Sequence, residues 1–470
     1  MRETGSLWAA TAGERASHDP LPGDRDVDVA IVGGGLTGLW TAWYLLQRDP
    51  GIRVAVLERE HLGFGASGRN GGWCSALFPQ SANALERRHG RDAALRMRRA
   101  MIDTVDEVAR AGASAGADFD YAKGGTVLYA RNAAQLRAAR SDVADAAGYG
   151  VDALELWGPE RVRAAGTRRG TAALGAAFDP DCARLHPAKL VRGLAAALGA
   201  RGVQLYERTN VLSWAPGPST RSARAGGRGV RPSVLTDRGT VTADAVVIAT
   251  EAYGAAIRRT HRRVLPMYSL MIATEPLPDA VWDEIGIAHG QTFADYRHLI
   301  VYGQRTADNR FAFGGRGAPY HFGSRISPAY DRVPRVFRHL AATLRELFPQ
   351  LPDLAVTHAW GGPLGIPRDW HAHVAYDPVS GIASAGGYVG DGLSTTNLAG
   401  RTLADLVTGT ASELTTLPWV GHRSPDWEVE PLRWLATNAG TLAMDLADRE
   451  EALTGCPSLI ARLVGPLTGH

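Results

Sequence analysis

Three glycines and one acidic residue in this chain have the spacing of a site that binds a dinucleotide. Gly33, Gly35 and Gly38 form the pattern Gly-x-Gly-x-x-Gly, and Glu58 follows 25 residues after the first of them. In such a site the first glycine allows a tight turn, the second lets the backbone approach a pyrophosphate, and the third lets a helix lie close to a sheet. The carboxylate of Glu58 is then placed to accept hydrogen bonds from a ribose.

The segments around these residues predict the elements that such a site needs. Apolar residues at 27–32 predict a short buried strand, those at 39–46 recur with helical spacing, and residues 53–58 predict a second strand. Strand, helix and strand in this order form a βαβ unit whose helix N-terminus can hold a phosphate. A glycine-rich loop without a ligand is the alternative, and the flanking elements together with Glu58 make it the weaker one.

Two other glycine-rich segments are placed to meet the same ligand. Residues 61–73 contain five glycines and leave the end of the second strand, on the edge where α/β sheets bind their ligands. Residues 390–397 combine glycines with hydroxyl side chains, follow a strand predicted at 382–385, and open a helix that runs to about residue 407. The N-terminus of that helix can stabilise an anion.

Composition describes an ordinary globular protein of two or three domains. The chain has 470 residues, 45% of them hydrophobic, and a formal net charge of +3, which favours neither a nucleic-acid nor a membrane-surface role. The three cysteines are far apart and predict neither a disulfide framework nor a metal site. We find no signal-peptide pattern and no apolar run long enough to span a membrane, so a cytoplasmic protein is expected.

The order of predicted elements divides the chain into two interleaved domains. Residues 1–25 read as an extended arm, with Trp8 as its anchor. Alternating strands and helices predict a dinucleotide-binding domain made of residues 26–115, 175–264 and 355–415. The alternation of strand and helix resumes at the strand 175–178. The alternation is broken at residues 116–174 and 265–354. Apolar side chains that recur with a period of two predict an inserted antiparallel sheet there, which forms a second domain of α+β type. Residues 416–470 read as terminal helices.

Taken together, these motifs resemble the flavoprotein superfamily of D-amino-acid oxidase, glycine oxidase and sarcosine oxidase. Within it, the run Gly65-Ala-Ser-Gly-Arg-Asn-Gly-Gly72 is similar to the branch of gamma-glutamylputrescine oxidase and the aminophosphonate oxidoreductases. The resemblance also draws on His186-Pro187, on the strand 246–250 and on residues 390–397, and it covers nearly the whole chain. It implies bound FAD, a cofactor domain of the glutathione-reductase type, and an antiparallel substrate-domain sheet over the flavin.

The resemblance implies roles for particular residues. Those expected at the pyrophosphate are Gly33, Gly35, Leu36, Thr37 and Gly38, and those expected at the adenosine end are Glu58, Arg59 and, through its backbone, Val211. Those expected around the isoalloxazine are Ser67, Arg69, Asn70, Gly71 and Gly72, with Gly390, Asp391, Gly392, Leu393, Ser394, Thr395 and Thr396 at its pyrimidine edge. Thr250, at the end of a buried strand, completes the expected cofactor set.

The chain departs from the family pattern at four positions. Relatives that oxidise simple amino acids often carry an arginine where this chain has Gly362-Pro363-Leu364, which argues against recognition of a simple α-carboxylate and leaves Arg368 as a candidate substitute. The lysine and the flavin-bonding cysteine of the sarcosine-oxidase type are both missing, which predicts noncovalent FAD. Glu251 replaces the glycine usual after Ala249-Thr250, a change that the sequence does not explain.

The expected activity is oxidation of an amine or amino-acid-like substrate, with hydride passing to flavin N5 and the resulting imine hydrolysing in water. Oxygen or another acceptor would then reoxidise the flavin. Candidates on the substrate side lie on or just after strands that should face the cofactor; they are Tyr268, Tyr302, Arg316, His321 and Trp360. Two alternatives stay open, namely oxidation of a 2-hydroxy acid on the same fold and a flavin-binding accessory subunit without turnover of its own.

Overall fold

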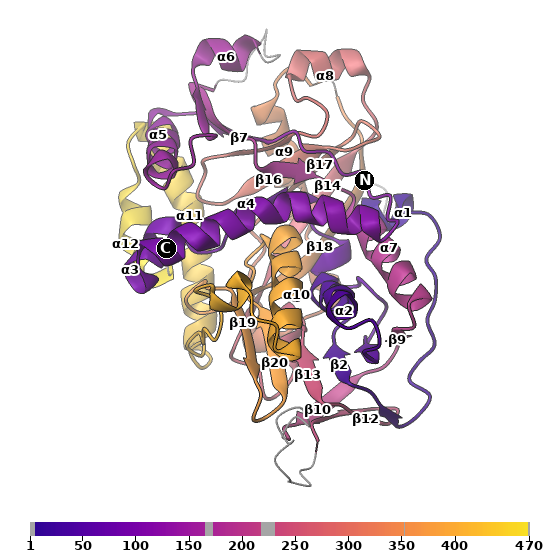
Figure 1. Cartoon of the computed structure of the whole chain (residues 1–470). Coiled ribbons are helices and arrows are strands. Elements are labelled where there is room, and N and C mark those ends of the chain that lie inside the picture. Colours follow the sequence, from indigo (N-terminus) through magenta and orange to yellow (C-terminus); the bar gives the residue numbers. More distant parts are fainter. Residues whose placement is uncertain (1–4, 165–172, 218–230, 352, 469–470) are drawn as a thin grey trace.

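The computed structural model describes residues 5–164, 173–217, 231–351 and 353–468 and contains two large sheets joined by many crossings of the chain (Figure 1). One sheet has six strands and the other has eight. The described part of the chain also contains two smaller sheets, one of four strands and one of two.

The six-stranded sheet contains the predicted βαβ unit at its centre. Its order is β19 (His373–Asp377), β20 (Ile382–Gly386), β13 (Ala245–Ile248), β2 (Val29–Val32), β3 (Val54–Leu57) and β9 (Gln204–Tyr206). All neighbours run parallel except β19 and β20. The helices α2 (Leu36–Arg48), α7 (Pro187–Ala200) and α10 (Gly392–Thr408) share its hydrophobic core.

Both faces of this sheet are buried, which explains why its strands are continuously apolar. Val29 and Ile31 of β2 belong to the core shared with the helices, whereas Ala30 and Val32 pack toward a four-stranded sheet. That smaller sheet has the order β1 (Arg25–Asp26), β12 (Thr240–Thr242), β11 (Ser233–Thr236) and β10 (Val211–Ala215). Residues 218–230, within a segment rich in glycine, proline, serine and arginine that is typical of a loop, lie outside the described residues.

The eight-stranded sheet is antiparallel except at one pair. Its order is β18 (Val356–Ile366), β14 (Leu265–Thr274), β17 (Phe311–Gly315), β16 (Val301–Arg305), β15 (Thr292–Asp295), β5 (Thr126–Ala130), β7 (Gly175–Asp179) and β6 (Glu155–Trp157), with β15 and β5 parallel. Phenylalanines of β15 and β17 form its core with the amphipathic helix α9 (Pro334–Leu347). The helices α5 (Ala133–Gly148), α6 (Pro159–Ala164) and α8 (Asp279–Ile285) lie at the outer end of this half of the molecule (Figure 1).

Two strands belong to a different sheet from the one that the sequence suggested. β7 pairs with β5 and β6, and β18 pairs with β14 over its whole length, so both lie in the eight-stranded sheet. The expected boundaries at residues 175 and 355 had placed them in the dinucleotide-binding domain. Strand pairing is decided by residues far away in sequence, and the local pattern of β7 and β18 is compatible with either sheet.

The N-terminal segment is not wholly extended, contrary to expectation. Residues Leu7–Thr11 form a short helix, α1, whose first turn is capped by the Ser6 side chain accepting from the Trp8 N–H. The Trp8 side chain is only 2% exposed, so its predicted role as an anchor is confirmed. A helix this short is marginal by itself, and burial of the Trp8 ring stabilises it.

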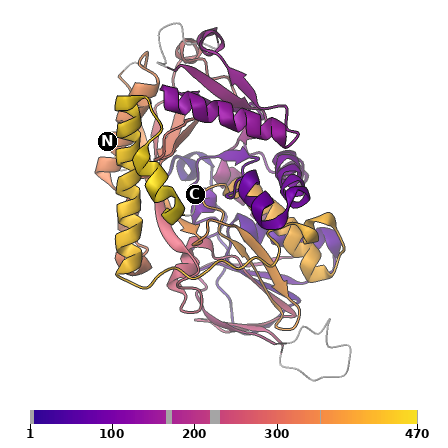
Figure 2. The same cartoon turned by 90° about the vertical axis from the view of Figure 1, so that its left-hand side faces the viewer.

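The remaining helices surround the two sheets. The helices α3 (Ala82–His89) and α4 (Arg91–Ser114) meet at Gly90, and the short sheet of β4 (Trp73–Ser75) and β8 (Cys182–Arg184) lies nearby. The C-terminal helices α11 (Leu432–Thr454) and α12 (Leu459–Thr468) lie on the outside of the molecule (Figure 2). Among the described residues, none of the helices is long and apolar enough to cross a membrane.

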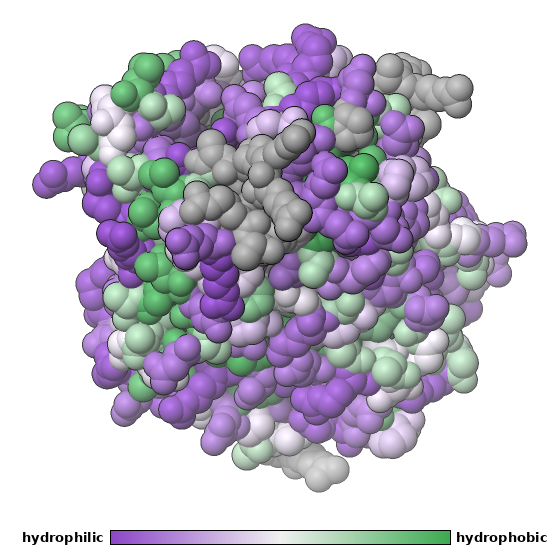
Figure 3. Space-filling view, turned by 90° about the horizontal axis from the view of Figure 1, so that it is seen from above, coloured by the Kyte–Doolittle hydropathy of each residue, from purple (hydrophilic) through white to green (hydrophobic). Residues whose placement is uncertain are grey.

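Hydrophobic side chains also reach the surface on the side where α11 lies. Seen from above, hydrophobic residues gather along the left-hand edge of the molecule, which is the side of α11 and α12 in Figure 1 (Figure 3). The exposed leucines of α11 are Leu432, Leu435, Leu442, Leu446 and Leu453.

Candidate functional site

A cavity of about 870 Å³ is lined by residues from both large sheets. At one end it meets the carboxyl ends of β2, β3 and β13, and at the other end it meets β14, β16 and β18. This is the edge at which open α/β sheets bind ligands.

The first turn of α2 forms one wall, and its glycines have no room for side chains. A Cβ on Gly33, whose φ is +112°, would lie 2.4 Å from the Ala249 carbonyl oxygen. A Cβ on Gly38 would lie 2.1 Å from the Gly33 oxygen, so the helix rests directly on the preceding turn. Gly35, the N-cap, supplies no side-chain hydrogen bond to the helix. Close backbone approach therefore requires glycine at positions 33 and 38.

Glu58 closes the end of the cavity beside this turn. Its carboxylate accepts from the Gly34 N–H at 2.9 Å and from the Glu60 N–H at 2.9 Å. Burial raises the pKa of this carboxyl, and the two amides oppose that shift. Arg59 and Val211 line the same end.

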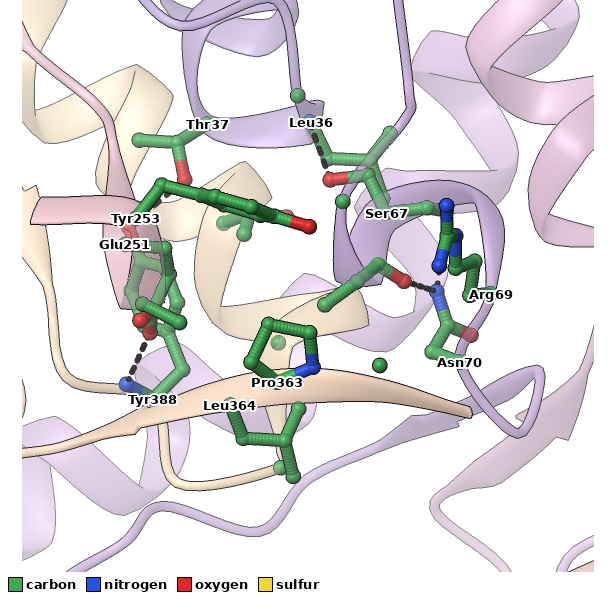
Figure 4. A pocket seen from close by; sticks show the side chains of 18 of the residues that line it. Leu36, Thr37, Ser67, Arg69, Asn70, Glu251, Tyr253, Pro363, Leu364 and Tyr388 are labelled. Carbon is green, nitrogen blue, oxygen red and sulfur yellow. Dashed lines mark hydrogen bonds between the residues drawn. The ribbon is translucent and has the colours of Figure 1, made fainter. Parts of the chain in front are cut away.

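The loop at residues 65–72 forms the opposite wall, and Ser67, Arg69, Asn70 and Gly71 line the cavity. Ser67 Oγ accepts from the Leu36 N–H at 2.8 Å, which ties the loop to the start of α2 (Figure 4). Arg69 forms an ion pair with Asp331 at 2.6 Å and lies over the Phe64 ring. A positive charge is thus fixed at the wall of the cavity.

The start of α10 forms the third wall. Asp391 is its N-cap and makes no side-chain capping bond, whereas at the start of α2 the Leu36 N–H donates to Ser67 Oγ. The Tyr388 hydroxyl lies 3.0 Å from the Thr37 hydroxyl and joins this wall to α2. Burial raises the pKa of Asp391 to about 6, against the opposing charge of Arg316.

Most of the residues expected around a cofactor line this one cavity. They are Gly33, Gly35, Leu36, Thr37, Glu58, Arg59, Ser67, Arg69, Asn70, Gly71, Val211, Thr250, Gly390, Asp391, Gly392, Leu393 and Thr396. Four others lie behind the walls. Gly38 and Gly72 are packed against backbone, the Ser394 hydroxyl donates to the Ser75 carbonyl at 2.6 Å, and the Thr395 hydroxyl donates to the Asp391 carbonyl.

The structure accounts for Glu251. Its φ is +44°, a left-handed conformation that glycine adopts most easily, which is why this replacement is unusual. The carboxylate oxygen Oε1 accepts from the Gly387 and Tyr388 N–H groups at 3.1 Å each, and these bonds offset the backbone strain (Figure 4). Burial raises the pKa of Glu251 to about 7, with the backbone amides opposing it.

Two of the five substrate-side candidates reach the cavity. The Tyr302 hydroxyl lies 2.8 Å from the Ser269 hydroxyl, and its ring meets Gly71, where a Cβ would lie 2.4 Å away. Burial raises the pKa of Tyr302, so this phenol stays protonated. Arg316 donates to the Val389 carbonyl at 2.7 Å and lies over the Trp370 ring, and burial lowers its pKa.

The other three candidates do not line the cavity. Tyr268 lies on the opposite face of β14, where its hydroxyl accepts from the Ser327 N–H at 3.1 Å, and His321 stacks on Tyr330 beside it. Trp360 lies behind the loop at residues 65–72 and donates to the Arg69 carbonyl. Arg368, suggested as a substitute for the arginine of the relatives, does not line the cavity either. It forms an ion pair with Glu428 at 2.9 Å outside the cavity.

Several lining residues were not singled out from the sequence. Tyr253 projects into the cavity near Arg59 and Phe64, and Tyr388, Trp370, Met271 and Leu364 complete the walls (Figure 4). Tyr253 and Tyr388 each follow a parallel strand within a few residues, the same signal that led to Gly33. That signal would have found both tyrosines.

A flavin dinucleotide fits these residues. The volume lies within the range of small-molecule sites, and one cavity is faced by the N-termini of α2 and α10, whose own N-cap residues make no side-chain capping bond. Between them the glycines bring bare backbone to the surface of the cavity. The residues can therefore hold the two phosphates at α2 and a flat, partly anionic ring near α10.

The chain belongs to the FAD-dependent oxidoreductase family, which matches residues 28–406. It is 31% identical over 424 residues to a probable oxidoreductase, OrdL, of Rhizobium meliloti, covering 88% of this chain and 90% of that protein. It is 30% identical over 423 residues to the gamma-glutamylputrescine oxidoreductase of Escherichia coli, covering 89% and 92%.

Solved structures share the fold. A glycine oxidase from Geobacillus kaustophilus superposes with a TM-score of 0.67 at 22% identity, covering 85% of this chain and 99% of that one. An L-amino acid deaminase from Proteus myxofaciens gives 0.68 at 17% identity, covering 89% and 97%. The expected family, fold class and FAD cofactor are confirmed, and the protein is an FAD-dependent oxidoreductase.

Proposed function

We propose that FAD lies lengthwise in the cavity and that the protein oxidises an amine or amino-acid-like substrate. The observation that carries this proposal is the continuity of one cavity from Glu58, past the first turn of α2, to Tyr302 and Arg316. The adenosine would lie at Glu58, Arg59 and Val211, the pyrophosphate at α2, and the isoalloxazine between Asn70–Gly71 and the start of α10. The substrate class is supported by the names of a relative and of a solved structure, a gamma-glutamylputrescine oxidoreductase and a glycine oxidase.

Bound FAD would supply the two-electron oxidation, with hydride leaving the carbon next to a neutral amine nitrogen. Hydrolysis of the imine by water completes the conversion. The task of the protein is to orient that carbon, exclude water and stabilise developing charge. The apolar side chains Met271, Leu364 and Trp370 would exclude water at the substrate end.

Tyr302 and Arg316 have distinct tasks in this proposal. The Tyr302 phenol, held by the Ser269 hydroxyl, orients the substrate as a neutral hydrogen-bonding group. Arg316, a buried positive charge at this end, binds an anionic group of the substrate that lies away from the reacting carbon.

Anaerobic bleaching of the purified yellow protein tests the proposal. Primary, secondary and phosphonate-bearing amines are added in turn, with 2-hydroxy acids as the comparison set. Bleaching by amines alone, with ammonia or an aldehyde released, supports amine oxidation. Bleaching by hydroxy acids alone overturns it, and a yellow protein that no substrate bleaches indicates an accessory flavoprotein. Admitting oxygen afterwards shows whether oxygen or another acceptor restores the colour.

Two finer points belong to the same proposal. We propose that FAD is held noncovalently, which is supported by the positions of the cysteines, since Cys74 and Cys182 are buried outside the cavity wall and Cys456 is exposed. Acid precipitation should release all of the flavin into the supernatant.

Three free thiols also support a cytoplasmic location, which cell fractionation would test.

A further inference from the structure

Three successive carbonyl groups of the flavin-facing loop are each bonded by a side chain from a different element. The Trp360 indole N–H of β18 donates to the Arg69 carbonyl at 2.8 Å. The Trp8 indole N–H of α1 donates to the Asn70 carbonyl at 2.7 Å, and the Gln304 amide of β16 donates to the Gly71 carbonyl at 2.6 Å.

The three donors are buried and fixed by their own surroundings. Their exposed fractions are 2% for Trp8, 4% for Trp360 and 1% for Gln304. The two indoles meet edge to face, with ring centroids 6.1 Å apart, and Trp8 also packs against His186. His186 in turn caps α7 by accepting from the Lys189 N–H, so the arrangement is anchored to a helix of the core.

The same three residues of the loop line the cavity on their other side. Arg69, Asn70 and Gly71 face the cavity while their carbonyl oxygens are occupied from behind. Gly71 has no room to move forward, because a Cβ there would lie 2.4 Å from the Tyr302 ring. The loop is thus held by contact with the Tyr302 ring and by the three donors to its carbonyl groups.

We propose that Trp8, Trp360 and Gln304 are positioning residues that fix the loop at residues 69–71 against the flavin and turn its carbonyl dipoles away from it. This inference rests on the proposed placement of the isoalloxazine beside Asn70 and Gly71. Carbonyl oxygens carry partial negative charge, and they would disfavour the reduced flavin if they pointed at it. The N-terminal arm is therefore part of the redox site, although Trp8 itself does not touch the proposed flavin position.

The test compares holoenzymes in which a phenyl ring replaces a single indole and its N–H. Trp8→Phe keeps an aromatic ring and removes the donor to Asn70. Trp434→Phe is the matched control, because Trp434 is partly exposed on α11 and does not line the cavity. Each protein is assayed for FAD content, thermal midpoint, flavin absorption spectrum, two-electron midpoint potential, and kcat and KM with the amine that bleaches the wild type.

We expect Trp8→Phe to retain FAD while its midpoint potential becomes more negative. A tenfold loss in the preference for reduced over oxidised flavin corresponds to about 30 mV in a two-electron couple. We expect kcat to fall by roughly tenfold, with KM within about twofold of the wild type, because orientation rather than substrate binding is disturbed. Trp434→Phe should match the wild type in every measurement.

An unchanged potential, spectrum and kcat in folded, FAD-loaded Trp8→Phe would overturn the inference. If that variant does not fold, Trp360→Phe decides the question in the same way, because it removes the donor to Arg69 and leaves α1 in place. Failure of the proposed function is distinguishable, since it would show in the wild type as absence of flavin or of bleaching.

Discussion

Glu251 is a buried acid whose protonation is coupled to folding. Its carboxylate receives two backbone amides but no positively charged side chain, and burial raises its pKa to about 7 from an ordinary value of 4.5. Between these two pH values the native state holds a proton that the unfolded state has released. The free energy of unfolding should therefore fall as pH rises from about 4.5 to about 7, by an amount on the order of 3 kcal/mol at most.

We expect Glu251→Gln to remove this pH dependence. The glutamine carbonyl can still accept from Gly387 and Tyr388, and it carries no charge to bury. Urea unfolding of both proteins at pH 5 and pH 8, with FAD in excess, measures the difference. The stability of the variant relative to the wild type should increase with pH, and a constant or decreasing difference would contradict the assignment.

Arg316 offers a second test at the level of one side chain. Replacing it with methionine should raise KM by roughly tenfold or more for amines that carry an anionic group, because a charge-assisted hydrogen bond contributes about 1.5–3 kcal/mol. Amines without such a group should be affected much less. Arg368→Met, which removes an arginine paired with Glu428 outside the cavity, is the control and should leave both KM values unchanged.

The sequence could not decide which face of a strand meets the cavity. Tyr268, Ser269 and Met271 lie on the same strand, and successive side chains point to opposite faces, so Ser269 and Met271 reach the cavity while Tyr268 enters the core. Tyr268 was chosen because its strand was expected to face the cofactor, which does not decide the face on which a given side chain lies. Glycines were easier to interpret, because the need for close backbone approach at Gly33 and Gly38 follows from a local motif.

The first turn of α2 is the element on which cofactor binding depends most directly. Gly33→Ala would place a Cβ 2.4 Å from the Ala249 oxygen at a φ of +112°, so the turn must shift. We expect the purified variant to contain less than about a tenth of the wild-type FAD, measured as the ratio of flavin to protein absorbance. Gly421→Ala is the control for positive φ without crowding, since nothing lies within 4 Å of that Cβ, and it should keep its flavin.

The packing of α10 on α2 holds two of the cavity walls at a fixed separation. Gly400 of α10 lies against the backbone of Trp40, where a Cβ would approach within 2.7 Å. Gly400→Ala should push the helices apart, lower the free energy of unfolding by roughly 1–3 kcal/mol and weaken FAD binding. Chemical unfolding and flavin titration measure the two effects, and a variant with unchanged FAD affinity would show that the helix spacing does not control the site.

At the scale of elements, locally encoded features were predictable and long-range pairings were not. The strands of the parallel sheet follow from continuous apolar runs, and α9 follows from its amphipathic period and the proline in its first turn. The sheet to which β7 and β18 belong depends on partners elsewhere in the chain. The short helix α1 depends on a buried place for Trp8, which no local pattern encodes.

The whole molecule should gain stability from its cofactor, because residues of both large sheets line one cavity. A ligand that binds only the native state adds about 2.7 kcal/mol at a free concentration of one hundred times its Kd. The thermal midpoint of flavin-depleted protein should therefore rise with added FAD, as scanning calorimetry would show. Riboflavin, which lacks the pyrophosphate and the adenosine, should raise it less, and equal effects of the two would contradict the role of α2.

The order of the parallel sheet has a consequence for the synthesis of the protein. β2 occurs near the beginning of the chain, yet the sheet also needs β13 and β20, and α10 ends only at Thr408. A ribosome must therefore translate beyond Thr408 before the last wall of the flavin site can leave its exit tunnel. The nascent chain cannot complete its flavin site earlier, so FAD is captured only after α10 has been synthesised.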